Sequence, residues 1–202
     1  MLILPDSIEA QERAAQAIAS GGIVAFRTDT FYGLGVDPFN RSALIALLML
    51  KGREDGKPLL VVISDESEVG RFFAARTPLF EAVSARHWPG ALTLVADARR
   101  EVPEELTART GSIGLRLPDD EQVRALLRAC GGALTAPSAN PAGEPPARTA
   151  AQVARYFPEG LALIVDSGAT RLDLPSTVLD VRGDSPRIIR AGAVNVDMRD
   201  EG

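Results

Sequence analysis

The sequence contains only one cysteine, Cys130, and only one histidine, His87. A single cysteine cannot form a disulfide within the chain or build a thiolate metal cage. A single histidine argues against zinc sites built on imidazoles and weakens any Ser-His-Asp interpretation. We therefore expect no metal site made by the protein itself. Any chemistry should rest on other residue types.

Long apolar runs are also missing, since none approaches the ~20 residues that a helix needs to cross a bilayer. The start, MLILPDSIEAQER, has no basic leader and is atypical of a signal peptide. We expect a soluble, cytoplasmic protein that does not bind membranes. The 202 residues, 46% of them hydrophobic, suit a single domain over 1–202. Its core is expected at about 7–193, followed by a polar tail at 194–202 that frays.

The sequence has no basic excess, because its formal net charge is -5. A dedicated nucleic-acid binder usually carries one, since neutralising phosphates supplies most of its affinity. The overall field would repel RNA slightly. A local basic cleft remains compatible with this net charge. The positions of the Lys and Arg residues therefore decide whether the protein can bind an anionic ligand.

Apolar segments alternate with amphipathic ones along the chain, which predicts an α/β fold. Several consecutive strands near the C-terminus lack an intervening helix, so we predict a mixed, open β-sheet flanked by helices. The expected helices are 8–20, 42–51, 78–86, 121–130 and 151–157, and the expected strands are 23–26, 59–63, 91–96, 113–117, 133–136, 163–165, 177–181 and 188–189.

Polar or basic clusters follow or end five of these strands and helices. Because ligand sites in open sheets gather at strand ends, the clusters are expected to converge on one anion-binding cleft. The clusters are 27–30, 51–57, 112–116, 137–140, and Ser176 together with Arg190.

The strongest positive cluster contains Lys51, Arg53 and Lys57, with glycines that let the loop bend. A triphosphate needs several cations, and the arginine fork suits phosphate oxygens. The alternative is a basic helix C-terminus that complements the helix dipole.

The segment Thr28 to Gly35 is neither a dinucleotide fingerprint nor a Walker A sequence. It is either a ligand loop or an ordinary polar turn.

Ser138 and Asn140 follow a short strand and could bond phosphate or ribose oxygens, although Pro, Ser and Asn are also ordinary turn formers. Ser138 lacks the G-x-S-x-G context of a nucleophile. Arg116 and Arg190 lie in apolar strands, so each must face a cleft or pair with an acid. Trp88 and Cys130 are expected to be packing residues.

Taken together, these segments resemble the YrdC family. The resemblance runs from about Gly22 to Gly192. It rests on TDTFYGLG at 28–35, KGR at 51–53 with KPL at 57–59, WPGALTLV at 88–95, GLRLP at 114–118, APSAN at 136–140, STVLD at 176–180 and IIRAG at 188–192. Each motif is weak alone, but seven in the family's order and spacing are specific.

The resemblance implies a twisted open sheet with a concave, positively charged cavity. It also implies synthesis of threonylcarbamoyl-AMP from L-threonine, bicarbonate and ATP with Mg²⁺, for tRNA modification by a separate transferase complex. Lys51 and Arg53 would be catalytic. The nucleotide would contact Arg53, Lys57, Ser112, Ser138, Asn140 and Arg190, and threonine would contact Thr30, Arg116, Ser176 and the backbone of Ala136.

Three positions depart from the family pattern: Arg27 and Glu54, where proline is usual, and Pro146, where serine often stands. Arg27 would add a cation at the cleft rim or face solvent. The chain resembles the short form without a C-terminal extra domain. One alternative function is a double-stranded RNA or tRNA binding protein without catalysis. Another is a related enzyme with a different carbamoyl acceptor.

Overall fold

The computed structural model describes residues 1–52 and 57–196 of the chain. The described strands are β1 Leu2–Pro5, β2 Val24–Arg27, β3 Tyr32–Gly35, β4 Leu60–Ile63, β5 Leu92–Asp97, β6 Ser112–Arg116, β7 Ala133–Thr135, β8 Leu163–Asp166, β9 Thr177–Asp180 and β10 Arg187–Arg190. The helices are α1 Ile8–Ala19, α2 Arg41–Leu50, α3 Pro78–His87, α4 Glu104–Thr107, α5 Glu121–Ala129 and α6 Ala150–Tyr156, with a 3₁₀ helix at Glu66–Arg71.

These strands form two mixed sheets, where the sequence predicted one. The four-stranded sheet has the order β1-β8-β2-β3 and the six-stranded sheet the order β10-β9-β5-β6-β4-β7. Parallel pairs such as β5 with β9 and β4 with β6 stand beside antiparallel pairs such as β5 with β6. The mixed character was therefore predicted correctly, and the division into two sheets was not.

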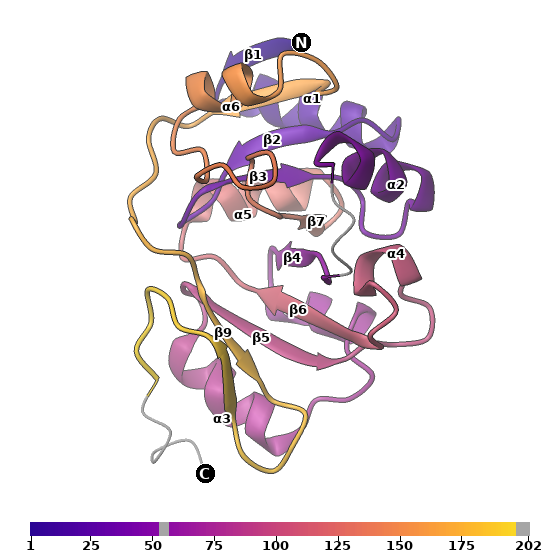
Figure 1. Cartoon of the computed structure of the whole chain (residues 1–202), viewed down its shortest axis with the longest axis vertical. Helices are drawn as coiled ribbons and strands as arrows, with labels where there is room; N and C mark the ends of the chain where they lie inside the picture. The colour runs from indigo at the N-terminus through magenta and orange to yellow at the C-terminus, as the bar shows by residue number, and fades with distance from the viewer. Residues whose placement is uncertain (53–56, 197–202) are drawn as a thin grey trace.

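The two sheets meet where β3 approaches β7 and the segment that follows it. The Leu34 amide donates to the carbonyl of Pro137 at 2.9 Å, and an isolated bridge joins Gly33 to Ser138. A Cβ at Gly33 would lie 3.2 Å from the backbone of Ala136, so this close approach favours glycine. Figure 1 shows β2 and β3 above β5, β6 and β9, with β7 and β4 between them.

Helices cover the outer faces and complete two hydrophobic clusters. Buried Ala10, Ala14 and Ile18 of α1 pack with α5 residues against one face of β2 and β8. The larger cluster lies on the other face and continues through the six-stranded sheet to α3, which covers the end of the molecule opposite α1 and α6 (Figure 1). Trp88 packs edge-on against Phe80 at 5.6 Å between ring centroids, as the sequence predicted.

Side-chain caps fix the starts of several helices. The Ser7 hydroxyl accepts from the Ala10 amide, and Thr149 accepts from the Gln152 amide. The Gln152 side chain accepts from the amide of Arg148, one residue before the amide that a capping box uses.

Both ends of the core lie further out than the sequence indicated. β1 pairs in parallel with β8, so the sheet begins at Leu2. Past Ala193, Val196 is buried and the carbonyl of Val194 accepts from the Thr177 hydroxyl, so residues 194–196 are held and do not fray. Within 1–52 and 57–196, no helix is long and apolar enough to cross a bilayer.

Candidate functional site

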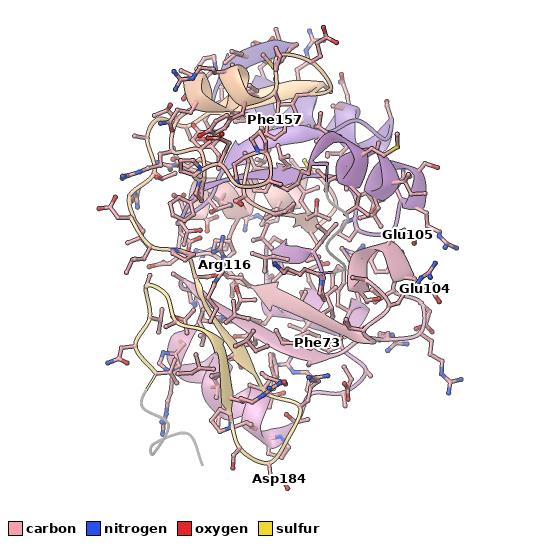
Figure 2. The ribbon with its side chains drawn as sticks, in the orientation of Figure 1. Phe73, Glu104, Glu105, Arg116, Phe157 and Asp184 are labelled. Atoms are coloured by element: carbon pink, nitrogen blue, oxygen red, sulfur yellow. The ribbon has the colours of Figure 1, made fainter. Side chains whose placement is uncertain are left out.

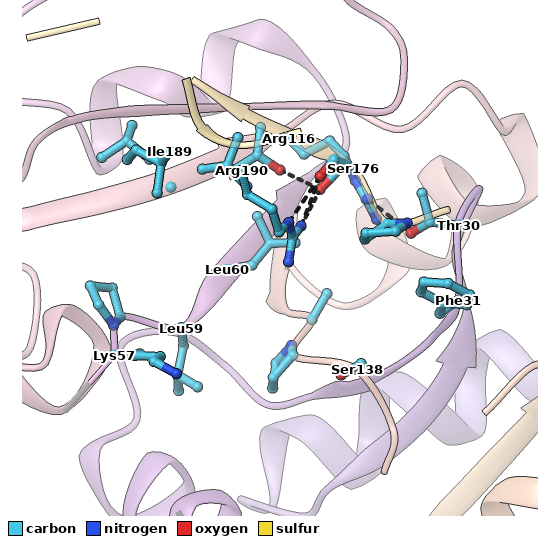
Figure 3. A pocket seen from close by; sticks show the side chains of 18 of the residues that line it. Thr30, Phe31, Lys57, Leu59, Leu60, Arg116, Ser138, Ser176, Ile189 and Arg190 are labelled. Carbon is cyan, nitrogen blue, oxygen red and sulfur yellow. Dashed lines mark hydrogen bonds between the residues drawn. The ribbon is translucent and has the colours of Figure 1, made fainter. Parts of the chain in front are cut away.

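A cavity of about 700 Å³ lies between the two sheets. β3 and the segment after β7 supply one wall, and β5, β6, β9 and β10 supply the other. Ten of the eleven predicted site residues line it: Thr30, Lys51, Lys57, Ser112, Arg116, Ala136, Ser138, Asn140, Ser176 and Arg190. Figure 3 shows side chains from both walls pointing toward one another. The eleventh, Arg53, lies outside the described residues, as does Glu54.

Cations dominate the charged groups of this cavity. Among the described lining residues, five are Lys or Arg and none is Asp or Glu: Lys51, Lys57, Arg116, Arg182 and Arg190. Thr, Ser and Asn side chains supply neutral hydrogen-bonding groups between them. This composition suits an anionic ligand that also carries hydroxyl or amide groups.

Lys51 joins the end of α2 to the segment after β7, which belongs to one wall of the cavity. It is the C-cap residue of α2, and its buried ammonium donates to the carbonyl of Ser138 at 2.5 Å and to that of Asn140 at 2.8 Å. Both bonds are charge-assisted and therefore stronger than neutral ones. The buried Oδ1 of Asn140 has no hydrogen-bond partner among the described residues, so this lining residue keeps an available acceptor.

Arg116 is fully buried and lines the cavity, and Figure 2 shows it in the middle of the molecule. Its guanidinium lies 3.2 Å from a carboxylate oxygen of Asp29 and donates to the Thr30 hydroxyl at 3.0 Å. Burial lowers the pKa of Arg116, and the charge of Asp29 opposes that shift. The sequence left open whether Arg116 faces a cleft or pairs with an acid, and here it does both.

Arg190 lies beside Arg116 and binds Ser176 (Figure 3). Its guanidinium donates to the Ser176 carbonyl at 2.8 Å and to the Ser176 hydroxyl at 3.2 Å. Burial, followed by the charge of Arg116, lowers the pKa of Arg190. An acidic partner was one expectation for this residue, but its bonds among the described residues go to a serine. Of these two neighbouring cations, Arg116 is the one that pairs with the carboxylate of Asp29.

The register of the six-stranded sheet separates two ends of the cavity. Thr93, which pairs with Val178, lies near Ser176, and their hydroxyls are 2.9 Å apart. At the other end of β5, Asp97 pairs with Ser112. Ser176 and Arg116, with Arg190 and Thr30 bonded to them, therefore lie at one end, and Ser112 lies at the other.

Arg27 neither extends the cleft rim nor faces solvent, so both expectations for it were wrong. It is 6% exposed and donates to Asp120 at 2.9 Å. Burial of a lone guanidinium would be costly, and Asp120, the N-cap of α5, supplies the counter-charge. Pro146, in contrast, does line the cavity.

Thr93 and Arg182 are among the lining residues that the sequence analysis missed. Arg182 follows β9, and two of its nitrogens bind the two carboxylate oxygens of Asp180 at 2.9 and 2.8 Å. Neither residue has a local signal that distinguishes it from an ordinary strand threonine or a surface arginine. The alternation of β5 and β9 could have suggested which side chains share a face.

Residues 16–192 match the Sua5/YciO/YrdC family model, which is described as "Telomere recombination". The chain is 38% identical over 171 residues to the threonylcarbamoyl-AMP synthase of Thiobacillus denitrificans, covering 85% of this chain and 89% of that protein. It is 39% identical over 172 residues to the one from Marinobacter nauticus, covering 83% and 89%.

Among solved structures, Pyrococcus abyssi Sua5 complexed with L-threonine is similar, with a TM-score of 0.89 and 32% identity. The match covers 95% of this chain but 57% of that one, so this chain spans little more than half the length of the Pyrococcus protein. Escherichia coli YciO shares the fold, with a TM-score of 0.84, 23% identity and 96% of each chain covered. The family match and these relatives establish that the chain belongs to the Sua5/YciO/YrdC family.

Proposed function

We propose that this protein is a threonylcarbamoyl-AMP synthase that joins L-threonine, bicarbonate or CO2, and ATP. The observation that carries the proposal is the cavity between the sheets, where ten predicted site residues from both walls meet. Relatives of similar length with this activity in their names, and a Sua5 structure with bound L-threonine, support it. A cytoplasmic location belongs to the same proposal.

In the proposed reaction, the threonine amine first attacks CO2 and loses a proton, which gives a carbamate. A carbamate oxygen then attacks the α-phosphorus of ATP, the bond between that phosphorus and the bridging oxygen breaks, and pyrophosphate leaves. Such chemistry depends on positioning and charge neutralisation more than on a protein nucleophile. The cations and hydroxyls of the cavity fit that requirement.

We assign threonine to the end of the cavity that holds Thr30, Arg116, Ser176 and the Ala136 backbone. The nucleotide would extend from Arg190, which borders this end at Ser176, over Lys57, Ser112, Ser138 and Asn140, with Arg53 completing this set from the sequence pattern. The catalytic cations would be Lys51 and Arg53. The two-ended arrangement supports this assignment, because it leaves the α-phosphate room beside the amino acid.

Mg²⁺ is proposed to enter with the triphosphate and to be held mainly by phosphate oxygens and water. The donor set fits this mode. The described lining offers hydroxyl and carbonyl oxygens without a carboxylate, and no group of three His, Cys, Asp or Glu residues in 1–52 and 57–196 could hold an ion. When bound, the ion would neutralise phosphate charge.

The direct test is pyrophosphate release by the pure protein with ATP, Mg²⁺, bicarbonate and L-threonine. Release that requires both threonine and bicarbonate is expected. Folded protein that releases pyrophosphate at the same rate without threonine would refute the proposal. L-serine in place of L-threonine tests whether the acceptor differs.

We also propose that a separate tRNA-modifying transferase complex uses the product. This part of the proposal is supported only by membership of the family. Weak binding of RNA is a separate possibility that the net charge of -5 disfavours. An RNA-binding function would give affinity for tRNA that falls steeply with salt, without threonine-dependent pyrophosphate release.

A further inference from the structure

The hydroxyl of Thr28 determines whether the hydroxyl of Thr30 can act as a hydrogen-bond donor or only as an acceptor toward the cavity. Thr28 is 2% exposed and Thr30 is 4% exposed, and both line the cavity. The Thr28 hydroxyl donates to the carbonyl of Phe31 at 2.7 Å. A carbonyl oxygen can only accept, so this bond consumes the single proton of Thr28.

The contact between the two threonines then has only one direction. Their hydroxyl oxygens lie 3.1 Å apart, and the Thr30 amide also donates to the Thr28 oxygen at 3.2 Å. Since Thr28 has no second proton to offer, the Thr30 hydroxyl must be the donor. The single proton of Thr30 is therefore directed at Thr28 and away from the cavity.

Arg116 uses one lone pair of the same Thr30 oxygen, to which it donates at 3.0 Å. A hydroxyl oxygen has two lone pairs, so one remains and no proton remains. Thr30 can thus meet a ligand only as an acceptor. A carboxylate would be repelled at that point, whereas an N–H or O–H group would be bound.

We propose that Thr28 is a positioning residue that fixes Thr30 as an acceptor for a donor group of the amino-acid substrate. This inference rests on the proposed function and deepens it. The donor is either the amine or the side-chain hydroxyl of L-threonine, while the substrate carboxylate belongs elsewhere in the site. Without the Thr28 hydroxyl, the Thr30 proton loses its acceptor and turns toward the substrate donor.

The test compares Thr28→Val with Thr28→Ser. L-Threonine binding is measured by calorimetry with α,β-methylene-ATP present, and the KM values for ATP and threonine are measured in the pyrophosphate assay. Thr28→Val is expected to weaken threonine binding roughly tenfold, the effect of one lost hydrogen bond to a charged or strongly polar group. The KM for ATP should stay within about twofold, and Thr28→Ser should restore threonine binding.

A second ligand, L-2-aminobutyrate, lacks the side-chain hydroxyl of L-threonine. It shows which group of the substrate donates to Thr30. If the Thr28→Val penalty disappears with this ligand, the hydroxyl of threonine is the group bound by Thr30; if the penalty persists, the amine is. A Thr28→Val, Thr30→Val double variant should bind threonine no more weakly than Thr30→Val alone, because Thr28 acts through Thr30.

Unchanged threonine binding in folded Thr28→Val, or equal weakening of threonine and ATP, would overturn the inference. The proposed function would survive, since it is read from the wild-type assay. A wild-type protein that binds no threonine would overturn both. If Thr28→Val does not fold, judged by circular dichroism, Thr28→Ala takes its place with the same expected outcomes.

Discussion

At the scale of single residues, Lys51 makes contacts that sequence patterns do not suggest, although the sequence did place it in the cleft. Its ammonium reaches back to the carbonyls of Ser138 and Asn140, and so holds the segment after β7. A lysine that follows a helix usually serves the helix dipole or solvent. Here the same charge also lines the cavity, so Lys51 both shapes the site and contributes to its charge.

Lys51→Met should therefore lower kcat/KM by about a hundredfold, because two charge-assisted hydrogen bonds are lost. The increase in KM should be larger for ATP than for threonine, since Ser138 and Asn140 are assigned to the nucleotide. Steady-state kinetics with each substrate varied in turn measures both effects. Arg13→Met, on the exposed face of α1, is the matched loss of a positive charge and should leave the kinetics unchanged. Wild-type kinetics in Lys51→Met would contradict the role.

At the scale of secondary-structure elements, the β9–β10 hairpin is fastened by one carboxylate. Asp180 is 6% exposed and receives hydrogen bonds from Arg182 and Arg187, which approach from the two sides of the turn. These guanidinium groups, Arg182 first, hold the pKa of Asp180 well below its usual range. The hairpin carries Arg190 into the cavity, so its stability bears on the site.

The lowered pKa gives a pH dependence with a definite sign. An unfolded aspartate takes up its proton near pH 3.9, whereas folded Asp180 stays ionised to lower pH. Its contribution to stability is therefore complete above about pH 5 and is lost as the pH falls toward the folded-state pKa. The stability difference between wild type and Asp180→Asn should be smaller at about pH 3 than at about pH 7, measured by urea unfolding. Equal differences at both pH values would contradict this account.

At the scale of the whole molecule, contacts between the two sheets hold the cavity in shape. One of them is the ion pair of Arg27, at the end of β2, with Asp120, which lies between β6 and α5. Both side chains are more than nine-tenths buried. Removing one partner of such a pair leaves a buried charge without compensation.

Asp120→Asn should lower the free energy of unfolding by about 3–5 kcal/mol. Asparagine keeps the shape and still caps α5, so the loss reports the ion pair. Urea unfolding at neutral pH measures it, and the Arg27→Met, Asp120→Asn double variant should recover part of the loss. Asp173→Asn, in an exposed pair with Arg148, serves as the control and should change the midpoint little. A loss no larger than that control would show that Arg27 tolerates burial alone.

The division into two sheets explains which elements the sequence could not predict. The segment 28–35 was expected as one polar loop, yet Tyr32–Gly35 forms β3, because β2 offers an antiparallel partner. β1 is a short strand at a sheet edge, and only its pairing with β8 distinguishes it from an extended terminus. Strand pairing is a long-range event, and local propensity carries little information about it.

The sequence by itself determined the longer helices, most of the strands, the mixed α/β character and the family, because periodicity and the seven motifs are local properties of the chain. It also identified many of the polar groups of the cavity. A charged residue in an apolar strand, such as Arg116, must pair with an acid or face a cleft, because burying it unpaired is costly. Only the tertiary structure decided how those groups are used. It paired Arg27 with Asp120, directed Lys51 to two carbonyls and brought Arg116 to the hydroxyl of Thr30. These outcomes depend on residues that lie roughly 90 positions apart in the chain and meet only when both sheets have formed.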